Sequence, residues 1–360
     1  MWFNDFLSKY KSGVSHEFLF YFNVRDIIDN NRPIDRYLYD EFIKHRNFSI
    51  VAYYNISNGL TFLDPLMERE FNKITNNEAA NLMNSLPSRI FPYIDLALKS
   101  TKMALFIDHA EKIIPATDIS SMNLEERMAL IWMCEWSVSP RISSVGSVIF
   151  MMSDNLVDVS REVLKSSYRV EPVLVELPGL DERKKYIEYL LKDNSVKTDI
   201  SIDEFSKLSS GLSKKAIKDI KLRAESEGVP ISFEFIKDKK HSILKKEYGD
   251  VLEFIYPEIS FDEIGGMEKA KNYLIKNIVE PVKKGDLRRV PMGILLCGPS
   301  GTGKTLLVNA LAKSSGFNCV KIDMSRILGQ YVGESEKNFK KCLLGAQSQE
   351  PVIVFVDEID

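Results

Sequence analysis

The sequence has few cysteines and few histidines, and neither residue type is clustered. The four cysteines (Cys134, Cys297, Cys319 and Cys342) show no C-x-x-C spacing, and the four histidines are equally dispersed. A disulfide framework and a structural zinc site are therefore not expected. Scattered single cysteines are typical of a reducing compartment, which favours the cytoplasm or an equivalent compartment of an organelle.

Long hydrophobic runs and an excess of positive charge are also missing. No run of 18 or more apolar residues exists, so no contact with a membrane is expected. The first residues carry Asp5, Lys9 and Lys11 and lack a small-residue cleavage site, which indicates an amphipathic segment rather than a signal peptide. The 48 basic residues are balanced by 51 acidic ones, a net charge of −3, which argues against a nucleic-acid partner.

Glycine is scarce in most of the chain. Seven of the 18 glycines precede residue 260, and eleven lie between Gly265 and Gly345. The last hundred residues therefore contain turns and close backbone approaches that the rest of the chain does without. At roughly 150 residues per domain, the 360 residues predict about two domains.

The apolar segments predict two successive α/β units. Strands that alternate with helices indicate a parallel sheet with crossover helices. The charged segment 236–257 is interpreted as a linker between residues 1–235 and 258–360. In the first unit, strands are predicted at 17–22, 48–54, 103–107, 146–155 and near 172–176, and helices around 76–86, at 124–136 and on both sides of Gly211. In the second unit, strands are predicted at 292–297, 317–323 and 352–356, with helices after the first two.

Residues 298–305 (GPSGTGKT) fit the phosphate-binding pattern G-x-x-x-x-G-K-[ST]. Glycines let successive N–H groups point at phosphate oxygens, and the following helix adds its positive N-terminal end. Lys304 is predicted to reach the β- and γ-phosphates of ATP, and the Thr305 hydroxyl to bind Mg²⁺. The alternative is a glycine-rich surface turn without a ligand. The residues predicted to bind nucleotide are Gly298, Pro299, Ser300, Gly301, Thr302, Gly303, Lys304, Thr305 and Leu306.

An apolar strand at 352–356 carries Asp357 and Glu358 at its end. In an open α/β sheet, ligands bind at the carboxyl ends of the strands. Asp357 is predicted to hold Mg²⁺ through water, and Glu358 to deprotonate the attacking water. The alternative is a solvated pair of acids at a strand end.

Three sequence features together resemble the AAA family of P-loop ATPases: GILLCGPSGTGKT (293–305), the upstream FDEIGGMEKAK (261–271), and DEID (357–360) after an apolar strand. This resemblance implies a three-layer fold around a parallel sheet, ATP and Mg²⁺ as cofactors, ATP hydrolysis, and a ring of identical subunits, expected to be a hexamer. It also implies that Ile264 and Gly265 contact the adenine base. Tyr331, Val332 and Gly333 match the loop that faces the pore of such a ring, where Tyr331 would grip a polypeptide. The alternative is that Tyr331 and Val332 only pack.

The resemblance extends more faintly to residues 1–235. Residues 105–111, 150–155 and about 181–230 resemble the acid-bearing strand, the sensor strand and the lid of the family. However, residues 14–58 contain no glycine, and His109 stands where the family has the glutamate that activates water. The sequence therefore predicts tandem AAA modules, the first degenerate and without ATP hydrolysis, as in certain bacterial and chloroplast-type tandem AAA proteins.

Residues 258–360 end on the acid-bearing strand of the second module. The resemblance implies further residues that would supply a sensor asparagine, an arginine finger and a lid, so the sequence is expected to be a fragment. The leading hypothesis for the intact protein is a motor that remodels or threads proteins. A nucleotide-switched scaffold is the alternative, and a nucleic-acid motor is less favoured.

Overall fold

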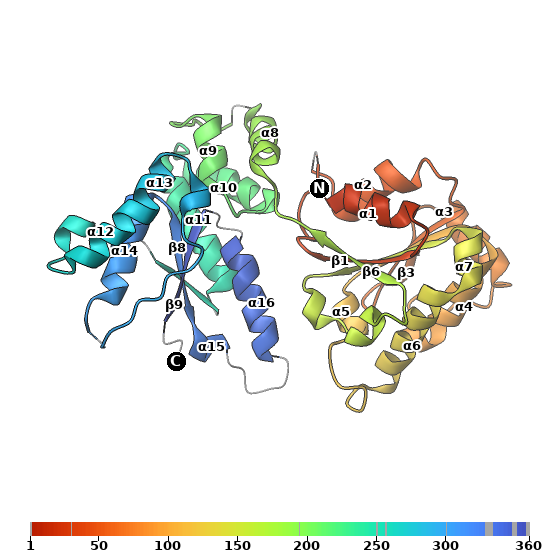
Figure 1. The fold of residues 1–360 in the computed structure, drawn as a ribbon. Coiled ribbons are helices and arrows are strands. Elements are labelled where there is room, and N and C mark those ends of the chain that lie inside the picture. Colours follow the sequence, from red (N-terminus) through yellow and green to blue (C-terminus); the bar gives the residue numbers. More distant parts are fainter. Residues whose placement is uncertain are drawn as a thin grey trace. The chain divides into compact units, whose positions relative to one another are not determined.

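The computed structural model describes residues 2–29, 31–193, 195–249, 251–255, 258–299, 301–327, 334–347 and 351–357 (Figure 1). The chain divides into two units. The first comprises Met1–Leu177 with Ser213–Lys215, and the second comprises Pro178–Leu212 with Ala216–Asp360. No helix in the described ranges combines the length and the apolar character needed to cross a membrane.

The first unit is built on a six-stranded sheet in the order β3-β2-β4-β5-β1-β6. Neighbouring strands are parallel, except that β2 and β3 form an antiparallel hairpin. Central strands buried on both faces are typical of parallel sheets that helices cover on both sides. The strands are β1 (Glu17–Phe22), β2 (Ile50–Asn55), β3 (Gly59–Phe62), β4 (Met103–Ile107), β5 (Val148–Ser153) and β6 (Val170–Val175).

Helices cover both faces of this sheet and complete three layers (Figure 1). One face carries α1 (Trp2–Lys11) and α2 (Ile34–Leu38), with the π-helical turn η1 (Tyr39–Ile43) after α2. Helix α3 (Pro65–Ile74) follows the β2–β3 hairpin and contributes Met67 to the core of this face and the buried Phe71 to the other core. The other face carries α4 (Pro87–Ser100), α6 (Leu124–Val138) and α7 (Pro140–Val145). The remaining short elements are α5 (Ala110–Ile113), η2 (Leu156–Asp158) and η3 (Arg161–Leu164). The α/β architecture predicted from the sequence is confirmed.

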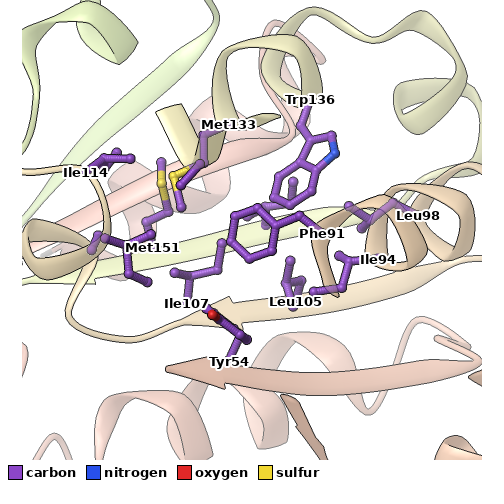
Figure 2. Packing of buried hydrophobic residues seen from close by; sticks show 14 of the residues in the cluster. Tyr54, Phe91, Ile94, Leu98, Leu105, Ile107, Ile114, Met133, Trp136 and Met151 are labelled. Atoms are coloured by element: carbon purple, nitrogen blue, oxygen red, sulfur yellow. The ribbon is translucent and has the colours of Figure 1, made fainter. Parts of the chain in front are cut away.

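Side chains that alternate along the strands form a core on each face of the first sheet. In β1, Leu19 belongs to one core, whereas Phe18 and Phe20 belong to the other, as the two-residue period of a strand requires. The first core lies between the sheet and α4 and α6. It includes Phe91 and Trp136, whose ring centroids are 5.0 Å apart (Figure 2).

Residues 76–86 form turns, although the sequence suggested a helix there. Asn76 and Asn77 have positive φ values of 51° and 62°, a conformation that asparagine tolerates and that ends α3. The next helix, α4, begins with Pro87, whose fixed φ suits the first turn of a helix. The prediction failed because helix-forming residues in this segment were outweighed by the turn preference of asparagine.

The second unit begins with a helical part. It contains α8 (Leu180–Leu191), α9 (Ile202–Leu208), α10 (Lys214–Glu227, whose first two residues belong to the first unit) and α11 (Phe233–Tyr248). Helix α9 starts at a capping box in which Ser201 and Glu204 each accept a backbone N–H of the other. The helices around Gly211 were expected from the sequence, and they are α9 and α10.

The segment 236–257, expected to be a linker, contains most of α11 and all of β7 (Leu252–Ile255). Ile236, Leu244 and Tyr248 are buried and recur at helical spacing, and Ser232 caps the helix through the N–H of Phe235. Strand β7 pairs antiparallel with β8 (Asn318–Asp323). The many lysines of this segment lie between apolar positions that anchor it, so overall charge was a poor guide.

The second sheet has the order β7-β8-β9, with β9 (Val352–Asp357) parallel to β8. Figure 1 shows α14 (Lys304–Ser315) and α16 (Glu334–Gln347) on opposite sides of these strands. The segment before α14 contains η4 (Phe261–Glu263), α12 (Glu268–Leu274), the π-helical turn η5 (Ile275–Val279), α13 (Glu280–Lys283) and η6 (Leu287–Arg289). Helix α15 (Met324–Ile327) follows β8.

Residues 292–297 do not form the strand that the sequence predicted. Met292 is fully exposed and Leu295 is 74% exposed. In the first unit, the strand that corresponds to residues 292–297 is β1. It pairs with β5 and β6, and both of these strands come after the acid-bearing strand β4 in the chain. The second unit is described only as far as its acid-bearing strand β9. Residues 292–297 therefore have no neighbour among the described strands, and a strand needs one.

Candidate nucleotide-binding site

The glycine-rich loop before α14 has a backbone that requires glycine. Gly301 and Gly303 have φ values of +78° and +85°. A Cβ atom on Gly303 would lie 3.0 Å from the Cε atom of Met267. The left-handed conformation therefore favours glycine at position 303, and any larger residue would also have to displace the end of the Met267 side chain.

The N-terminus of α14 has neither a cap from any described side chain nor an acidic residue in its first turn, whereas several other helices are capped. Helices α3, α6, α9 and α11 are capped by the side chains of Asp64, Asn123, Ser201 and Ser232. The backbone N–H groups of the first turn of α14 therefore remain available to an anion, which the helix dipole also favours.

Lys304, the first residue of α14, folds over the loop. Its Nζ atom donates hydrogen bonds to the carbonyl oxygens of Gly298 (2.7 Å) and Pro299 (2.9 Å). Thr302 Oγ1 donates to the Pro299 oxygen at 2.8 Å, which tightens the same turn. The ammonium group thus lies above the loop, where phosphate oxygens, as stronger acceptors, would compete for its protons.

The predicted metal-binding acid lies at the end of β9. Asp357 Oδ2 forms an ion pair with Lys321 Nζ at 2.8 Å, and the Asp357 side chain is 34% exposed. Lys321 lies on the neighbouring strand β8, two residue pairs before the Asp323–Asp357 pair in the register. Lys321 pairs with Phe355, and Asp357 lies two residues beyond Phe355 on the same face of the sheet, which lets the two charged side chains meet; the sequence did not predict this pairing.

The fold directs the loop and Asp357 to one edge of the second sheet. Helix α14 ends at Ser315 and β8 begins at Asn318, so α14 runs back along the sheet. Its N-terminus therefore lies toward the carboxyl ends of β8 and β9, because these two strands are parallel. Ile353 of β9 packs against the apolar clusters that contain Leu307 and Val308 of α14.

Ile264 and Gly265, the predicted base contacts, lie in the segment that packs on α14. Ile264 is only 6% exposed and belongs to a cluster with Phe261 and Leu307, so its side chain is part of the core. The carbonyl oxygen of Ile264 accepts a hydrogen bond from Lys271 Nζ. A Cβ atom on Gly265 would meet open space. Together with the contact between Met267 and Gly303, this places the segment beside the loop.

Oxygen donors suited to Mg²⁺ are present on both sides of the site. The Thr305 hydroxyl lies on the exposed first turn of α14, and Asp357 supplies a carboxylate. Leu306, on the same turn, is 43% exposed. No group of three or more His, Cys, Asp or Glu side chains that could hold a metal lies within the described ranges. A nucleotide-bound Mg²⁺ needs no such group, since phosphates and water supply most of its ligands.

Several predicted residues lie outside the described residues: Ser300, Tyr331, Val332, Gly333 and Glu358. Their predicted roles therefore stay predictions.

The corresponding edge of the first unit carries a different set of side chains. Asp108 follows β4, as the sequence predicted, and His109 next to it has a left-handed backbone (φ 53°). Asn155, at the end of the segment that resembles the sensor strand, donates a hydrogen bond to Asp158 Oδ2 at 3.1 Å. Sequence reasoning missed Arg25, which contacts both Asp108 and His109. Its only sequence signal is a position just after β1, where a phosphate-binding loop would begin.

Three parts of the chain match known protein families. Residues 1–176 match the N-terminal Rossmann-like domain of AAA+ chaperones, and residues 181–249 match the second helical domain of AAA+ chaperones. Residues 294–360 match the ATPase family associated with various cellular activities (AAA). All three matched models describe AAA proteins or AAA+ chaperones, each over part of the chain. The resemblance expected from the sequence is thereby confirmed, and the AAA+ chaperone matches extend it over the first 249 residues.

Individual relatives are similar over parts of this chain. The Cell division cycle protein 48 homolog of Archaeoglobus fulgidus is 25% identical over 301 residues, which cover 76% of the chain and 40% of that protein. Peroxisomal ATPase pex6 of Schizosaccharomyces pombe is 32% identical over 221 residues, 58% of the chain and 23% of that protein. Protein mac-1 of Caenorhabditis elegans is 38% identical over 110 residues, 29% of the chain and 14% of that protein. The chain thus spans less than half the length of these relatives.

Proposed function

We propose that these residues belong to an ATP-hydrolysing AAA motor that remodels or threads protein substrates. The observation that carries the proposal is the glycine loop with an uncapped helix N-terminus behind it and Lys304 folded over it. The family membership supports ATP hydrolysis, and the AAA+ chaperone matches support a protein as the substrate. A ring of identical subunits, a hexamer, is the proposed assembly.

Each residue of the proposed site has a separate task. The loop N–H groups and Lys304 would bind and orient the phosphates, and Thr305 and Asp357 would hold Mg²⁺, the latter through water. When bound, Mg²⁺ would neutralise charge on the phosphate oxygens. Asp357 must first exchange its ion pair with Lys321 for that interaction. Glu358 would take the proton of the attacking water.

The test of the nucleotide site is Lys304→Ala in the complete protein. Removal of the ammonium should lower nucleotide affinity at least tenfold and abolish most ATP turnover, because a charge-assisted contact to phosphate is lost. Lys284→Ala is the control, since it is the same change at a side chain that is 75% exposed and whose ion pair with Glu280 is 3.9 Å long. Equal ATPase rates in the two variants would refute the site. Light scattering with and without ATP would report the oligomeric state.

The proposed action on polypeptide depends on Tyr331. Tyr331→Ala should abolish remodelling while ATP hydrolysis continues. If remodelling stays intact in this variant, the proposed gripping of polypeptide is wrong.

A nucleotide-switched scaffold is the second candidate, because the same loop would serve a protein that only binds ATP. Glu358→Gln distinguishes the two, since it should retain binding and lose hydrolysis. ATP-dependent partner binding that persists in this variant without hydrolysis would favour the scaffold. Salt-dependent, tight binding of DNA would favour a nucleic-acid motor instead.

We further propose that the first unit does not hydrolyse ATP and that the protein works in a reducing compartment such as the cytoplasm. The first proposal is supported by His109 in place of the expected glutamate and by the glycine-free segment 14–58. The second is supported by the four cysteines, all of which are free thiols.

A further inference from the structure

In the first unit, the segment after β1 uses its own N–H groups internally. The N–H groups of Asp26, Ile28 and Arg32 donate to carbonyl oxygens of residues 23, 32 and 29 within the same segment. The helix that follows, α2, is preceded by Pro33, which has no N–H, and begins with the buried Ile34. These three amides of the described part of the segment are therefore not available to a phosphate.

Arg25, in the segment that follows β1, contacts acidic residues at the ends of two further strands. Its Nη1 atom lies 2.5 Å from Asp108 Oδ1, and its Nε atom lies 3.0 Å from Asp154 Oδ1. Nη2 lies 3.1 Å from His109 Nδ1. Asp108 follows β4 and Asp154 follows β5, and the sheet order places β5 between β4 and β1. One guanidinium thus ties together the carboxyl ends of three adjacent strands.

The position of Arg25 corresponds to that of a ligand in a working site. The carboxyl ends of β1 and β5 lie where the strand order changes direction, which is where α/β sheets bind ligands. Asp108 matches the acid that would hold the metal. The planar fork of arginine suits two carboxylates at once. Burial alone would lower the pKa of the Arg25 guanidinium. The neighbouring Asp108 and Asp154 outweigh this effect and raise the pKa of Arg25 above its ordinary value.

The surrounding charges disfavour an anionic ligand. Asp35 lies in the first turn of α2, where a phosphate-binding helix has no acid. Burial, together with the charge of Asp108, raises the pKa of the Asp35 carboxyl group. A nucleotide at this edge would meet the carboxyl groups of Asp35, Asp108 and Asp154. The guanidinium of Arg25, which is their main counter-charge, already forms ion pairs with Asp108 and Asp154. Asp154 also fixes the strand ends through its backbone oxygen, which accepts the N–H of Phe22 at 3.1 Å.

We infer that Arg25 is a built-in counter-ion that closes the carboxyl edge of the first sheet against nucleotide. It supplies permanently the positive charge that Mg²⁺ would supply to the strand-end acid in a hydrolysing unit, and so it holds β1, β4 and β5 together in one arrangement. The first unit then keeps its structure whatever nucleotide the second unit binds. This inference deepens the proposal that the first unit does not hydrolyse ATP, and it is independent of the site at Lys304.

Arg25→Ala tests the clamp by amide exchange in the complete protein. The N–H of Phe22, bonded to Asp154, and the N–H of Asp108, bonded to Tyr54, report on the joined strand ends. Both should exchange at least tenfold faster in Arg25→Ala. Arg36→Ala is the matched control, because Arg36 is 52% exposed and its ion pair with Asp40 is 3.6 Å long. Unchanged exchange in Arg25→Ala would overturn the inference.

A second measurement uses Mn²⁺ as a replacement for the lost charge. In Arg25→Ala, Asp108 and Asp154 lose their common cation, so millimolar Mn²⁺ should slow the exchange of these amides again. Mn²⁺ should have no such effect on the wild type, in which the guanidinium occupies the carboxylates. If Mn²⁺ has no effect on the variant, Arg25 does not act as the counter-ion of these acids.

Titration with Mg²⁺ and ADP separates this inference from the proposed function. The wild type should bind no more than one ADP per chain, and Lys304→Ala should remove that binding. A site that remains in Lys304→Ala and is protected near Asp108 would overturn the closed first unit. If Lys304→Ala binds ADP like the wild type but without protection near Asp108, only the site in the second unit is refuted.

Discussion

At the scale of single residues, the four cysteines lie in different surroundings. Cys297 is exposed and directly precedes the glycine loop, whereas Cys134, Cys319 and Cys342 are buried. Burial raises the pKa of the Cys134 thiol to about 12 and that of Cys319 to about 11. Since the thiolate is the reactive form, these two thiols are inert near neutral pH.

We therefore expect a maleimide at pH 7.5 to modify Cys297 first. Mg²⁺ and ATP should slow this modification several-fold in the wild type, because a bound phosphate chain would cover the neighbouring loop. Mass spectrometry of the labelled peptides measures both effects, and Lys304→Ala should lose the protection by ATP. Labelling of Cys134 before Cys297 would contradict the burial of Cys134.

A second residue, Glu17, is fully buried at the start of β1, and neither carboxylate oxygen has a partner among the described residues. Burial raises its pKa well above the ordinary value of 4.5. A group with a raised carboxyl pKa binds its proton more tightly in the folded state. Its contribution to stability is therefore complete below pH 4.5, and it falls as the pH rises from there toward the folded-state pKa.

Glu17→Gln should remove this pH dependence. The unfolding free energy of the wild type should fall relative to the variant by about 1.4 kcal/mol per pH unit between those two pKa values. All three tryptophans (Trp2, Trp132 and Trp136) lie in the first unit, so their emission during denaturation measures it. Glu135→Gln, at an exposed position, is the control. Parallel stability curves for the wild type and Glu17→Gln would refute the prediction.

At the scale of elements, α6 shows how burial distinguishes similar residues of one helix. Leu130 is 6% exposed and belongs to the core that contains Trp136, whereas Leu124 is 71% exposed. The helix begins at a capping box formed by Asn123 and Glu126. The sequence pattern predicted the helix, but apolar residues lie around most of its circumference, so the pattern did not separate its buried face from its exposed one.

Leu130→Ala should lower the unfolding free energy of the first unit by about 2–5 kcal/mol, because it leaves a cavity in the core. Leu124→Ala, with the same chemistry in the same helix, should change it by less than about 0.5 kcal/mol. Denaturant titrations followed by tryptophan emission compare the two variants. Similar losses in both would contradict the burial of Leu130.

At the scale of the whole molecule, two AAA-related units follow each other with different sites at their sheet edges. The first edge is bridged by Arg25, and the second carries a glycine loop and Asp357. If only the second edge binds nucleotide, the ligand should stabilise the two units unequally. Binding stabilises a folded unit by about 2.7 kcal/mol at a ligand concentration of 100 times Kd.

Mg²⁺ and ADP at that concentration should slow amide exchange in α14 about 100-fold, and Lys304→Ala should abolish the effect. The tryptophan-reported unfolding of the first unit should gain no stability from ADP in Lys304→Ala. Stabilisation of that transition by ADP in Lys304→Ala would show that the first unit binds nucleotide after all.

The sequence by itself determined the features that depend on local patterns. The strands β1, β4, β5 and β9 could be predicted from apolar runs in the sequence. The glycine loop could be predicted from the spacing of its glycines, lysine and threonine, which is specific to phosphate-binding loops. These signals are read within a few residues, so they need no knowledge of the partners. The same holds for Lys304, whose position after Gly303 fixes its role as the first residue of α14.

Only the tertiary structure decided which distant residues meet. Arg25 contacts Asp108 and Asp154, which are 83 and 129 residues away in the sequence, and no local pattern encodes such a contact. Pairing also decided the fate of apolar segments: 252–255 became a strand beside β8, whereas 292–297, without a neighbouring strand among the described residues, did not. The physical reason is that a strand is completed by hydrogen bonds from another segment, and an ion pair by a charge from elsewhere in the chain.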